Sequence, residues 1–580
     1  MKKLVSLFLA LIMLTALVPS VMADEPVKIT YGSTQSVANF AEFEIIQELC
    51  QKLNIELTVT NYDYDSLLVM LADGSFPDIM ASRIEYLDNV LKSGYALNIE
   101  PYLDTHLTNM KSEMYAQTNE LLQMLYPYED GAIYFACPAV GISEYQGLPG
   151  QYRGYIVRWD YYKELGCPPI NSIEDYIDVL CAMVDLHPTD EDGNPNWAYG
   201  VNKSLRDMGG YFSSFQVDIG FNLWSTAYLY KCNNVTNKLI NGYTDVEKSS
   251  YWSDMRFQNA LYRRGLDNDY PYYNTDVFIM DGDEFNALGV EGRFMGVHYV
   301  EDELYLNSIK EDPNSLAAYV VIPSESTWLY ADVNLMLGNA PAYYTFFNKN
   351  SQNIDKVLEF WNYMYDPDFV REWKVGKQGE SWDIIDGVPT MKPEYLMKLA
   401  EYDEDFVEKR GYGRASGQIV GYMGTTKHPD GYLLDLSMTM ENSIAAQLPW
   451  QKDFAEHYGE EFWVDAQYKL MKHNQYDAGE TISAALTDIP MDYKRTLELM
   501  NDVMETAMPE LIMAESDEEF LDIQERVLAE LKDLGEEEVW TWFNTQWEAA
   551  REMIWPIFEQ SCLEQGLRPE GVRDINDYNY

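Results

Sequence analysis

Residues 27–80 read VKITYGSTQSVANFAEFEIIQELCQKLNIELTVTNYDYDSLLVMLADGSFPDIM, and this stretch decides the fold. The apolar residues recur first at the spacing of a strand and then at the spacing of a helix. The predicted elements are strand, helix, strand, helix and strand, over residues 27–31, 38–53, 54–60, 64–72 and 77–80. Strands that alternate with helices in this order are typical of a mainly parallel α/β sheet.

The same alternation returns further along the chain. Strands are predicted over 133–136, 155–158, 294–297 and 317–322, with helical patterns between them. From about residue 430 the chain is mostly helical. The clearest helix there has a capping box at Ser516 and Glu519 and ends at Gly535.

The first 23 residues have the three-part pattern of a secretory signal peptide. Lys2 and Lys3 precede an apolar run of roughly 15 residues, which is shorter than the ~20 residues that a spanning helix needs. Small or aliphatic residues then lead to a predicted cut after Ala23. We therefore expect a secreted protein of the periplasm or the cell surface. The first cysteine is Cys50, so no lipoprotein cysteine is evident at the cut.

Composition limits the classes of partner. The chain has 580 residues, too many for one core, so two or more lobes are expected. Its formal net charge of −54 argues against nucleic acid and anionic membrane surfaces as partners. The six cysteines are widely spaced, which permits disulfides but not a disulfide scaffold. The six histidines form no pair at metal-ligand spacing.

Several stretches, taken in order, resemble the extracellular solute-binding proteins (family 1) of ABC-type sugar importers, and most of all their large oligosaccharide-binding subgroup. The matching pieces are YDSLLVMLADGSFPDI (64–79), EDGAIY (129–134), IVRWDYYKELG (156–166), ALYRRGL (260–266), VGKQGESW (375–382) with DGVP (386–389), and 540–547 in the terminal helices. No single piece is decisive, but their order along the chain is specific.

The resemblance implies a two-lobed, periplasmic-binding-protein-like α/β fold of type II, with mainly parallel sheets flanked by helices, crossing strands as a hinge and a helical C-terminal region. After the signal peptide (1–23), lobe 1 is expected to comprise residues 24–140 and 323–400. Lobe 2 is expected to comprise residues 141–322 and 401–580. An oligosaccharide would bind in the cleft between the lobes of a monomer, and ABC transporter permease subunits would receive it.

A sugar site needs aromatic platforms together with planar polar groups, and in open α/β sheets such sites lie at the carboxyl ends of the strands. The loops at these ends and the tryptophan-bearing turns give the candidate ligand-binding residues Ser33, Thr34, Gln35, Ser82, Arg83, Trp224, Trp252, His298, Tyr299, Trp328 and Trp382. For each tryptophan, packing in the core is the alternative. Arg158 and Asp160 are interpreted as a structural pair.

Relatives of this family can carry a calcium loop after the helix that corresponds to 172–186. Here Asp190, Asp192 and Asn194 alternate as such a loop requires, but Ala198 and Tyr199 stand where further oxygen ligands are needed. We therefore expect a solvated acidic turn and no cofactor, with calcium at this loop as the alternative.

Enzyme classes are not favoured. The sequence contains no nucleophile elbow, P-loop or Cys–His constellation, and no local motif frames a catalytic carboxylate pair. The alternatives to a transport protein are a secreted glycoside hydrolase and a surface glycan-binding or adhesion protein.

Overall fold

The computed structural model describes residues 25–34, 40–83, 86–111, 132–138, 154–201, 229–233, 238–268, 270–298, 303–327, 343–415, 419, 421–422, 426–472, 482, 486 and 489–564. The signal peptide predicted over 1–23 lies outside them. None of the helices in this part of the chain combines the length and the apolar content required to cross a membrane.

The strands are β1 (Val27–Ser33), β2 (Ile55–Asn61), β3 (Ile79–Arg83), β4 (Tyr155–Arg158), β5 (Trp197–Gly200), β6 (Tyr230–Asn233), β7 (Lys238–Asn241), β8 (Phe294–Val297), β9 (Tyr319–Ile322), β10 (Tyr343–Phe347), β11 (Trp382–Ile385) and β12 (Val388–Met391). The helices of the first half are α2 (Glu44–Leu53), α3 (Tyr64–Asp73), α4 (Leu87–Ser93), α6 (Trp159–Glu164), α7 (Ile173–Leu186), α9 (Ser250–Asn268), α10 (Gly282–Val290) and α11 (Glu303–Glu311). Those of the second half are α12 (Ile354–Asn362), α13 (Pro367–Val375), α14 (Pro393–Ala400), α15 (Met440–Ala445), α16 (Pro449–Tyr458), α17 (Trp463–Leu470), α19 (Met491–Ile512), α20 (Asp517–Leu534) and α21 (Glu536–Glu564).

The N-terminal sheet has the order β10-β3-β1-β2 and confirms the alternation predicted over 27–80. β1 pairs in parallel with both β2 and β3, whereas β10 adds antiparallel to β3. Local chemistry sets the boundaries of α3, because the Asp63 carboxylate accepts a hydrogen bond from the Ser66 N–H and Gly74 takes the left-handed conformation at the end.

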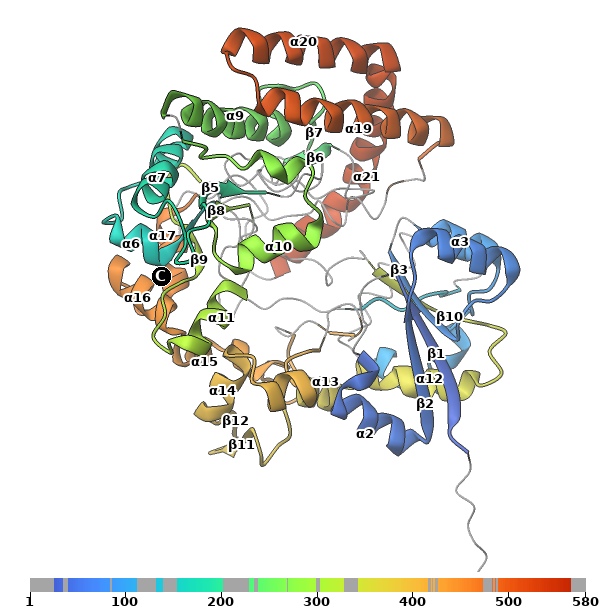
Figure 1. Ribbon diagram of the computed structural model, residues 1–580. Coiled ribbons are helices and arrows are strands. Elements are labelled where there is room, and N and C mark those ends of the chain that lie inside the picture. The colour runs from blue at the N-terminus through green and yellow to red at the C-terminus, as the bar shows by residue number, and fades with distance from the viewer. Residues whose placement is uncertain are drawn as a thin grey trace, which may run out of the picture.

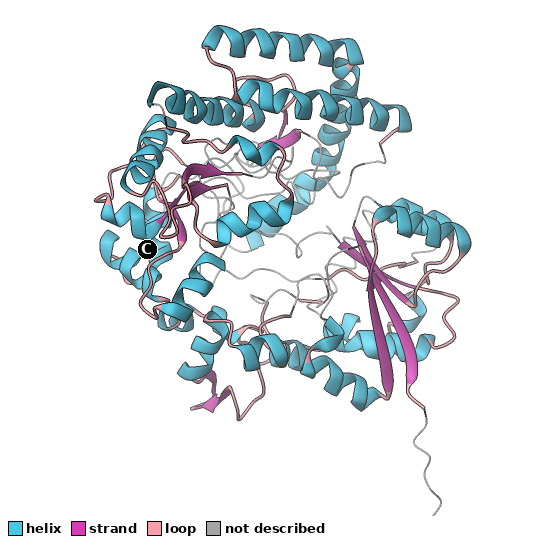
Figure 2. Cartoon of the chain, viewed as in Figure 1, coloured by secondary structure: helices cyan, strands magenta, loops and turns pink. Residues whose placement is uncertain are grey.

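Two large clusters of buried side chains divide the described chain. The N-terminal core surrounds the four-stranded sheet and draws on residues 29–137 and 344–434. The larger core draws on residues 155–322 and 450–554, and it holds the pairs β4–β9 and β5–β8 together with α7, α9, α19 and α20. Figures 1 and 2 show the N-terminal sheet on one side and the helix-rich part on the other.

The lobe boundaries stay a prediction, but the two cores show which segments of the chain pack together. Residues 406–434, assigned from the sequence to lobe 2, contribute to the N-terminal core. The strand predicted over 133–136 is reduced to a single bridge between Ala136 and Thr345. Within the described residues, β4 and β9 pair with each other inside the larger core. The chain passes back to that core through residues 435–448, which are fully described.

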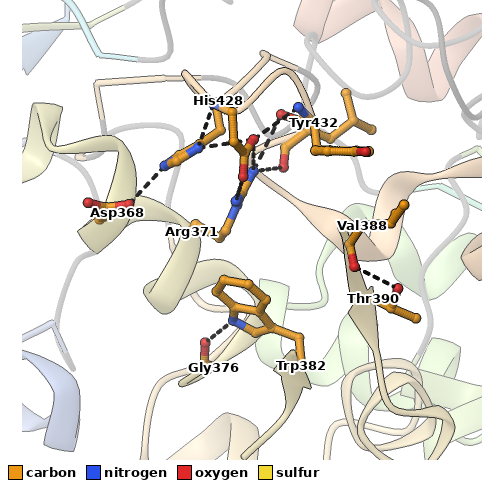
Figure 3. A network of polar contacts seen from close by, with 10 residues as sticks. Asp368, Arg371, Gly376, Trp382, Val388, Thr390, His428 and Tyr432 are labelled. Carbon is orange, nitrogen blue, oxygen red and sulfur yellow. Dashed lines mark hydrogen bonds and ion pairs between the residues drawn. The ribbon is translucent and has the colours of Figure 1, made fainter. Parts of the chain in front are cut away.

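A polar network anchors the start of this passage (Figure 3). The Arg371 guanidinium on α13 is buried and donates to both carboxylate oxygens of Asp430, at 2.5 and 3.0 Å. It also donates to the Leu433 carbonyl at 2.9 Å and lies 5.6 Å from the centre of the Trp382 ring. His428 lies between Asp430 and the exposed Asp368, at 3.1 and 2.9 Å. The loop before the passage is thereby fixed to α13.

This network predicts a specific acid sensitivity. Burial alone would raise the pKa of Asp430, but hydrogen bonds from Arg371 and from the Tyr432 N–H lower that pKa to about 2. Because the folded-state pKa lies below the ordinary value of 3.8, the carboxylate stabilises the fold above about pH 4, and this contribution is lost as the pH falls toward 2. We expect Asp430→Asn to lower the free energy of unfolding at pH 7 by about 1–2 kcal/mol and to flatten its decline below pH 4 in urea titrations.

The matched control is Asp368→Asn, at the 91 % exposed end of the same network. It should change the stability little. Equal effects of the two substitutions at pH 7 would contradict the role assigned to Asp430.

Candidate functional site

The carboxyl edge of the N-terminal sheet brings together residues from three strands. Ser33 at the end of β1 pairs with Ala81 on β3, and Ala81 pairs with Thr345 on β10. Ser82 lies one residue further along β3, opposite Tyr344. The Thr34 N–H donates to the Ala81 carbonyl at 3.1 Å, which holds the residue after β1 against β3. Four residues with hydroxyl side chains therefore lie near one edge, with Ser33 and Thr345 in one cross-strand row and Ser82, the next residue along β3, on the opposite face of the sheet from that row; Thr34 follows Ser33.

A glycine makes this close packing possible. A Cβ atom at Gly32 would lie 2.8–2.9 Å from side-chain atoms of Tyr62, Met80 and Pro77. Such distances are shorter than any tolerated contact, so a larger residue would push the end of β1 away from its neighbours. Gly32, within β1, is therefore a packing requirement at the site.

Three of the four hydroxyls are unusual because they are buried without a partner. Ser82 and Thr345 are 0 % and 1 % exposed. Within the described residues, the Oγ atoms of Thr34, Ser82 and Thr345 have no hydrogen-bond partner. An unsatisfied buried polar group costs roughly 1–3 kcal/mol. Such groups at one edge are suited to hydrogen-bond a hydroxylated ligand, which would recover that cost.

The surroundings of this edge extend beyond the described residues. The chain leaves β1 through 35–39, leaves β3 through 84–85 and enters β10 from 341–342, all of which lie outside them. In Figure 1 the ends of β1 and β3 face the rest of the molecule. We call this edge, defined by Ser33, Thr34, Ser82 and Thr345, the hydroxyl edge.

The predicted site residues divide into four groups, the last of which is the two tryptophans Trp252 and Trp382. Ser33, Thr34 and Ser82 meet at the hydroxyl edge, and Arg83 ends β3 beside them. His298 directly follows β8, at the carboxyl end of the parallel β5–β8 pair in the larger core. The predicted residues that lie outside the described ones are Gln35, Trp224, Tyr299 and Trp328, and the Arg83 side chain shares this status.

Two predicted tryptophans pack in cores. Trp252 on α9 is fully buried, and its indole N–H donates to the Tyr243 carbonyl at 3.0 Å. Trp382 is 9 % exposed, and its indole N–H donates to the Gly376 carbonyl at 2.9 Å. Each indole N–H already donates to a backbone carbonyl, and each ring is packed in a core, as the alternative to ligand binding expects. That Trp252 and Trp382 contact a ligand stays a prediction.

Sequence reasoning missed Thr345. It is the single non-aromatic residue in the strand YYTFF. A lone polar residue inside a buried aromatic strand is the signal that could have found it. The interpretation of Arg158 and Asp160 as a structural pair is confirmed, because the guanidinium donates to both carboxylate oxygens at 3.0 and 2.9 Å.

The acidic loop at 189–196 pairs with a cation from a distant part of the chain, Arg293, which directly precedes β8. The Asp190 carboxylate accepts hydrogen bonds from Asn194 and lies 3.2 Å from the Arg293 guanidinium. Arg293 is 4 % exposed, and it also donates to the Asn196 side chain at 3.0 Å and to the Pro195 carbonyl. Within the part of the chain that the structure describes, no three His, Cys, Asp or Glu side chains are placed to hold a metal ion. These residues do not fit a calcium ion.

Comparison with known proteins shows which solved structures share this fold. No family model matches the sequence, and no curated protein matches it. Among solved structures, the alginate-binding protein AlgQ2 without calcium ion aligns with a TM-score of 0.54 and 13% identity, over 90% of this chain and 98% of the other. The chain has the solute-binding-protein fold.

Two further structures share it. An EF-hand mutant of FusA, an ABC-transporter substrate-binding protein of Streptococcus pneumoniae in complex with fructo-nystose, has a TM-score of 0.56, 14% identity and coverage of 90% and 99%. An HMO-binding, ABC-transporter-associated solute-binding protein from Bifidobacterium longum infantis has a TM-score of 0.52, 13% identity and the same coverage. The two-lobed α/β fold expected from the sequence is thereby confirmed.

The unpartnered hydroxyls predict an uncommon response to substitution. Thr345→Val keeps the shape of the side chain and removes a hydroxyl that has no described partner, so we expect an unchanged or raised free energy of unfolding. Thr30→Val on β1 is the matched control, because its hydroxyl donates to the Asp78 carboxylate at 2.8 Å and accepts from the Asp78 N–H at 2.9 Å. The control should lose about 1 kcal/mol in urea unfolding. A larger loss for Thr345→Val would show that its hydroxyl is already satisfied.

Proposed function

We propose that this protein is an extracytoplasmic substrate-binding protein that captures an oligosaccharide and passes it to the permease of an ABC importer. The observation that carries the proposal is the hydroxyl edge: buried hydroxyls without described partners, near the carboxyl ends of β1 and β3, where open α/β sheets bind ligands. Solved proteins of the same fold, by their descriptions, bind alginate and fructo-nystose.

The predicted cellular context fits this role. A cleavable signal peptide over 1–23 would export the chain, and transfer of the ligand would require permease subunits as partners. We expect a monomer that acts without catalysis, since its task is to bind and release. A secreted glycoside hydrolase is the second candidate, but no observation among the described residues favours it.

A neutral oligosaccharide is the expected ligand, because a chain with a net charge of −54 repels polyanions. Thermal unfolding in the presence of neutral oligosaccharides should reveal one that stabilises the full chain, by roughly 2.7 kcal/mol at a concentration of 100 Kd. Mass spectrometry of the incubated ligand should detect no shorter products.

Variants connect the binding to the hydroxyl edge. Ser82→Ala combined with Thr345→Val should weaken the affinity about tenfold, whereas Thr30→Val should leave it unchanged. Shortened products would identify a hydrolase. Stabilisation by alginate oligosaccharides alone would overturn the neutral class, and stabilisation by peptides alone would overturn the sugar assignment.

We further propose that the loop at 189–196 needs no calcium, because Arg293 supplies the positive charge that a divalent ion would bring. Melting temperatures in calcium and in EGTA should agree within about 1 °C. Arg293→Met should lower the free energy of unfolding by about 2–3 kcal/mol, because it removes the cation beside Asp190 and the donor to the Asn196 side chain. A rise of several degrees when calcium is added to the unaltered chain would contradict this proposal.

A further inference from the structure

A cavity lies apart from the hydroxyl edge. It has a volume of about 370 Å³ and is bounded by α11, α14, α16 and α17 and by the passage 435–448. Its walls come from the larger core on one side, through Tyr305 and Phe462, and on the other from Leu396 of α14, which belongs to a small separate cluster with Trp382. In Figure 1 the helices α11, α14 and α15 lie at the opposite side of the molecule from β1 and β2. We call it the passage pocket.

The lining of the passage pocket is aromatic and uncharged. Although 23% of the chain is charged, the described residues that line the pocket include no Asp, Glu, Lys, Arg or His. Tyr305, Tyr402 and Trp463 supply aromatic rings, and Ser437, Ser443 and Gln451 supply neutral polar groups. The volume lies near the lower end of the range for small-molecule sites, which is about 300–1,000 Å³.

Hydrogen-bond donors at this pocket lack partners. The Tyr305 side chain is 2 % exposed and lines the pocket; no described residue bonds to its hydroxyl, which is not one of the fully buried unpartnered polar atoms of the described chain. The indole N–H of Trp463 and the side-chain N–H groups of Gln451 likewise have none there, whereas the Gln451 carbonyl oxygen accepts from the Leu448 N–H at 2.8 Å. Burial, and to a lesser degree the charge of Glu401, raises the pKa of Tyr305 to about 12, so this hydroxyl keeps its proton at neutral pH.

The backbone conformation of Tyr402, at the rim of the pocket, also indicates that its aromatic ring has a function there. Tyr402 follows α14 with a φ of 52°, in the left-handed region where glycine or asparagine usually ends a helix. A bulky residue is unfavourable in this conformation and persists where the surroundings require it. Here it places a 43 % exposed ring on the lining of the pocket.

We propose that the passage pocket is a second binding site, for a neutral mono- or disaccharide. A sugar ring has an apolar face that packs on aromatic rings, and its oxygens accept hydrogen bonds from the Tyr305 hydroxyl, the Trp463 indole and the Gln451 amide. A purely apolar molecule would leave these donors unpaired. An anion would find no described cation in the lining. This site is independent of the ligand proposed for the hydroxyl edge.

The test uses the full chain with glucose, N-acetylglucosamine, sucrose and maltose, each titrated by calorimetry up to about ten millimolar. At least one of these sugars should bind the unaltered chain. It should bind the Ser82→Ala/Thr345→Val variant with the same Kd, because that variant alters only the hydroxyl edge. Tyr305→Phe and Trp463→Phe should each weaken the binding at least about fivefold.

Matched controls separate binding from folding. Tyr305→Phe should keep its melting temperature, because the hydroxyl bonds to no described residue. Tyr319→Phe, whose buried hydroxyl donates to the Phe294 carbonyl at 2.9 Å, should unfold at a lower temperature and keep its sugar affinity. The proposal is overturned if none of the four sugars binds, if Tyr305→Phe leaves the affinity unchanged, or if the hydroxyl-edge variant abolishes binding.

Discussion

The antiparallel pairing of β10 with β3 is the contact on which the rest of the structure depends. β3 belongs to the first 83 residues, whereas β10 arrives only after the chain has built β4 to β9 in the larger core. Main-chain hydrogen bonds from Tyr343↔Arg83 to Phe347↔Ile79 return the chain to the N-terminal sheet. Because the two cores share one chain in this interleaved order, neither is a continuous segment, and both must be joined by passages between them.

The same pairing builds the hydroxyl edge. Without β10, Ser82 would lie on an edge strand, and Thr345 would not lie beside Ala81. The aromatic neighbours of Thr345 bury the strand: Tyr344, Phe346 and Phe347 are all fully buried. This burial deprives the hydroxyls of water, and the lack of described partners makes them available to a ligand. The strand β10 therefore contributes both to the packing of the sheet and to the proposed binding site.

Sequence reasoning predicted the elements whose boundaries are set by nearby residues, such as helix caps. The strands β1, β2 and β3 and the helix α20, which is capped at Ser516 and ends at Gly535, follow from capping residues and periodicity, and the structure confirms them. β10 was not predicted, because an aromatic run has no polar alternation and its partner lies far away in the sequence. Similarly, the pairing of the Asp190 loop with Arg293 joins residues that local patterns cannot connect.

For the site, the sequence located the strand ends but could not rank the aromatic residues. Trp252 and Trp382 satisfy their indole N–H groups on nearby carbonyls, whereas Trp463, which sequence reasoning did not select, keeps an N–H without a described partner. Composition carries no information on hydrogen-bond satisfaction, because that depends on tertiary packing.

The most direct measurement of the central claim is a crystal structure of the full chain with a bound neutral oligosaccharide. The account predicts sugar hydroxyls within hydrogen-bonding distance of the Ser82 and Thr345 Oγ atoms, and a sugar bound elsewhere, with both hydroxyls still unpaired, would contradict it.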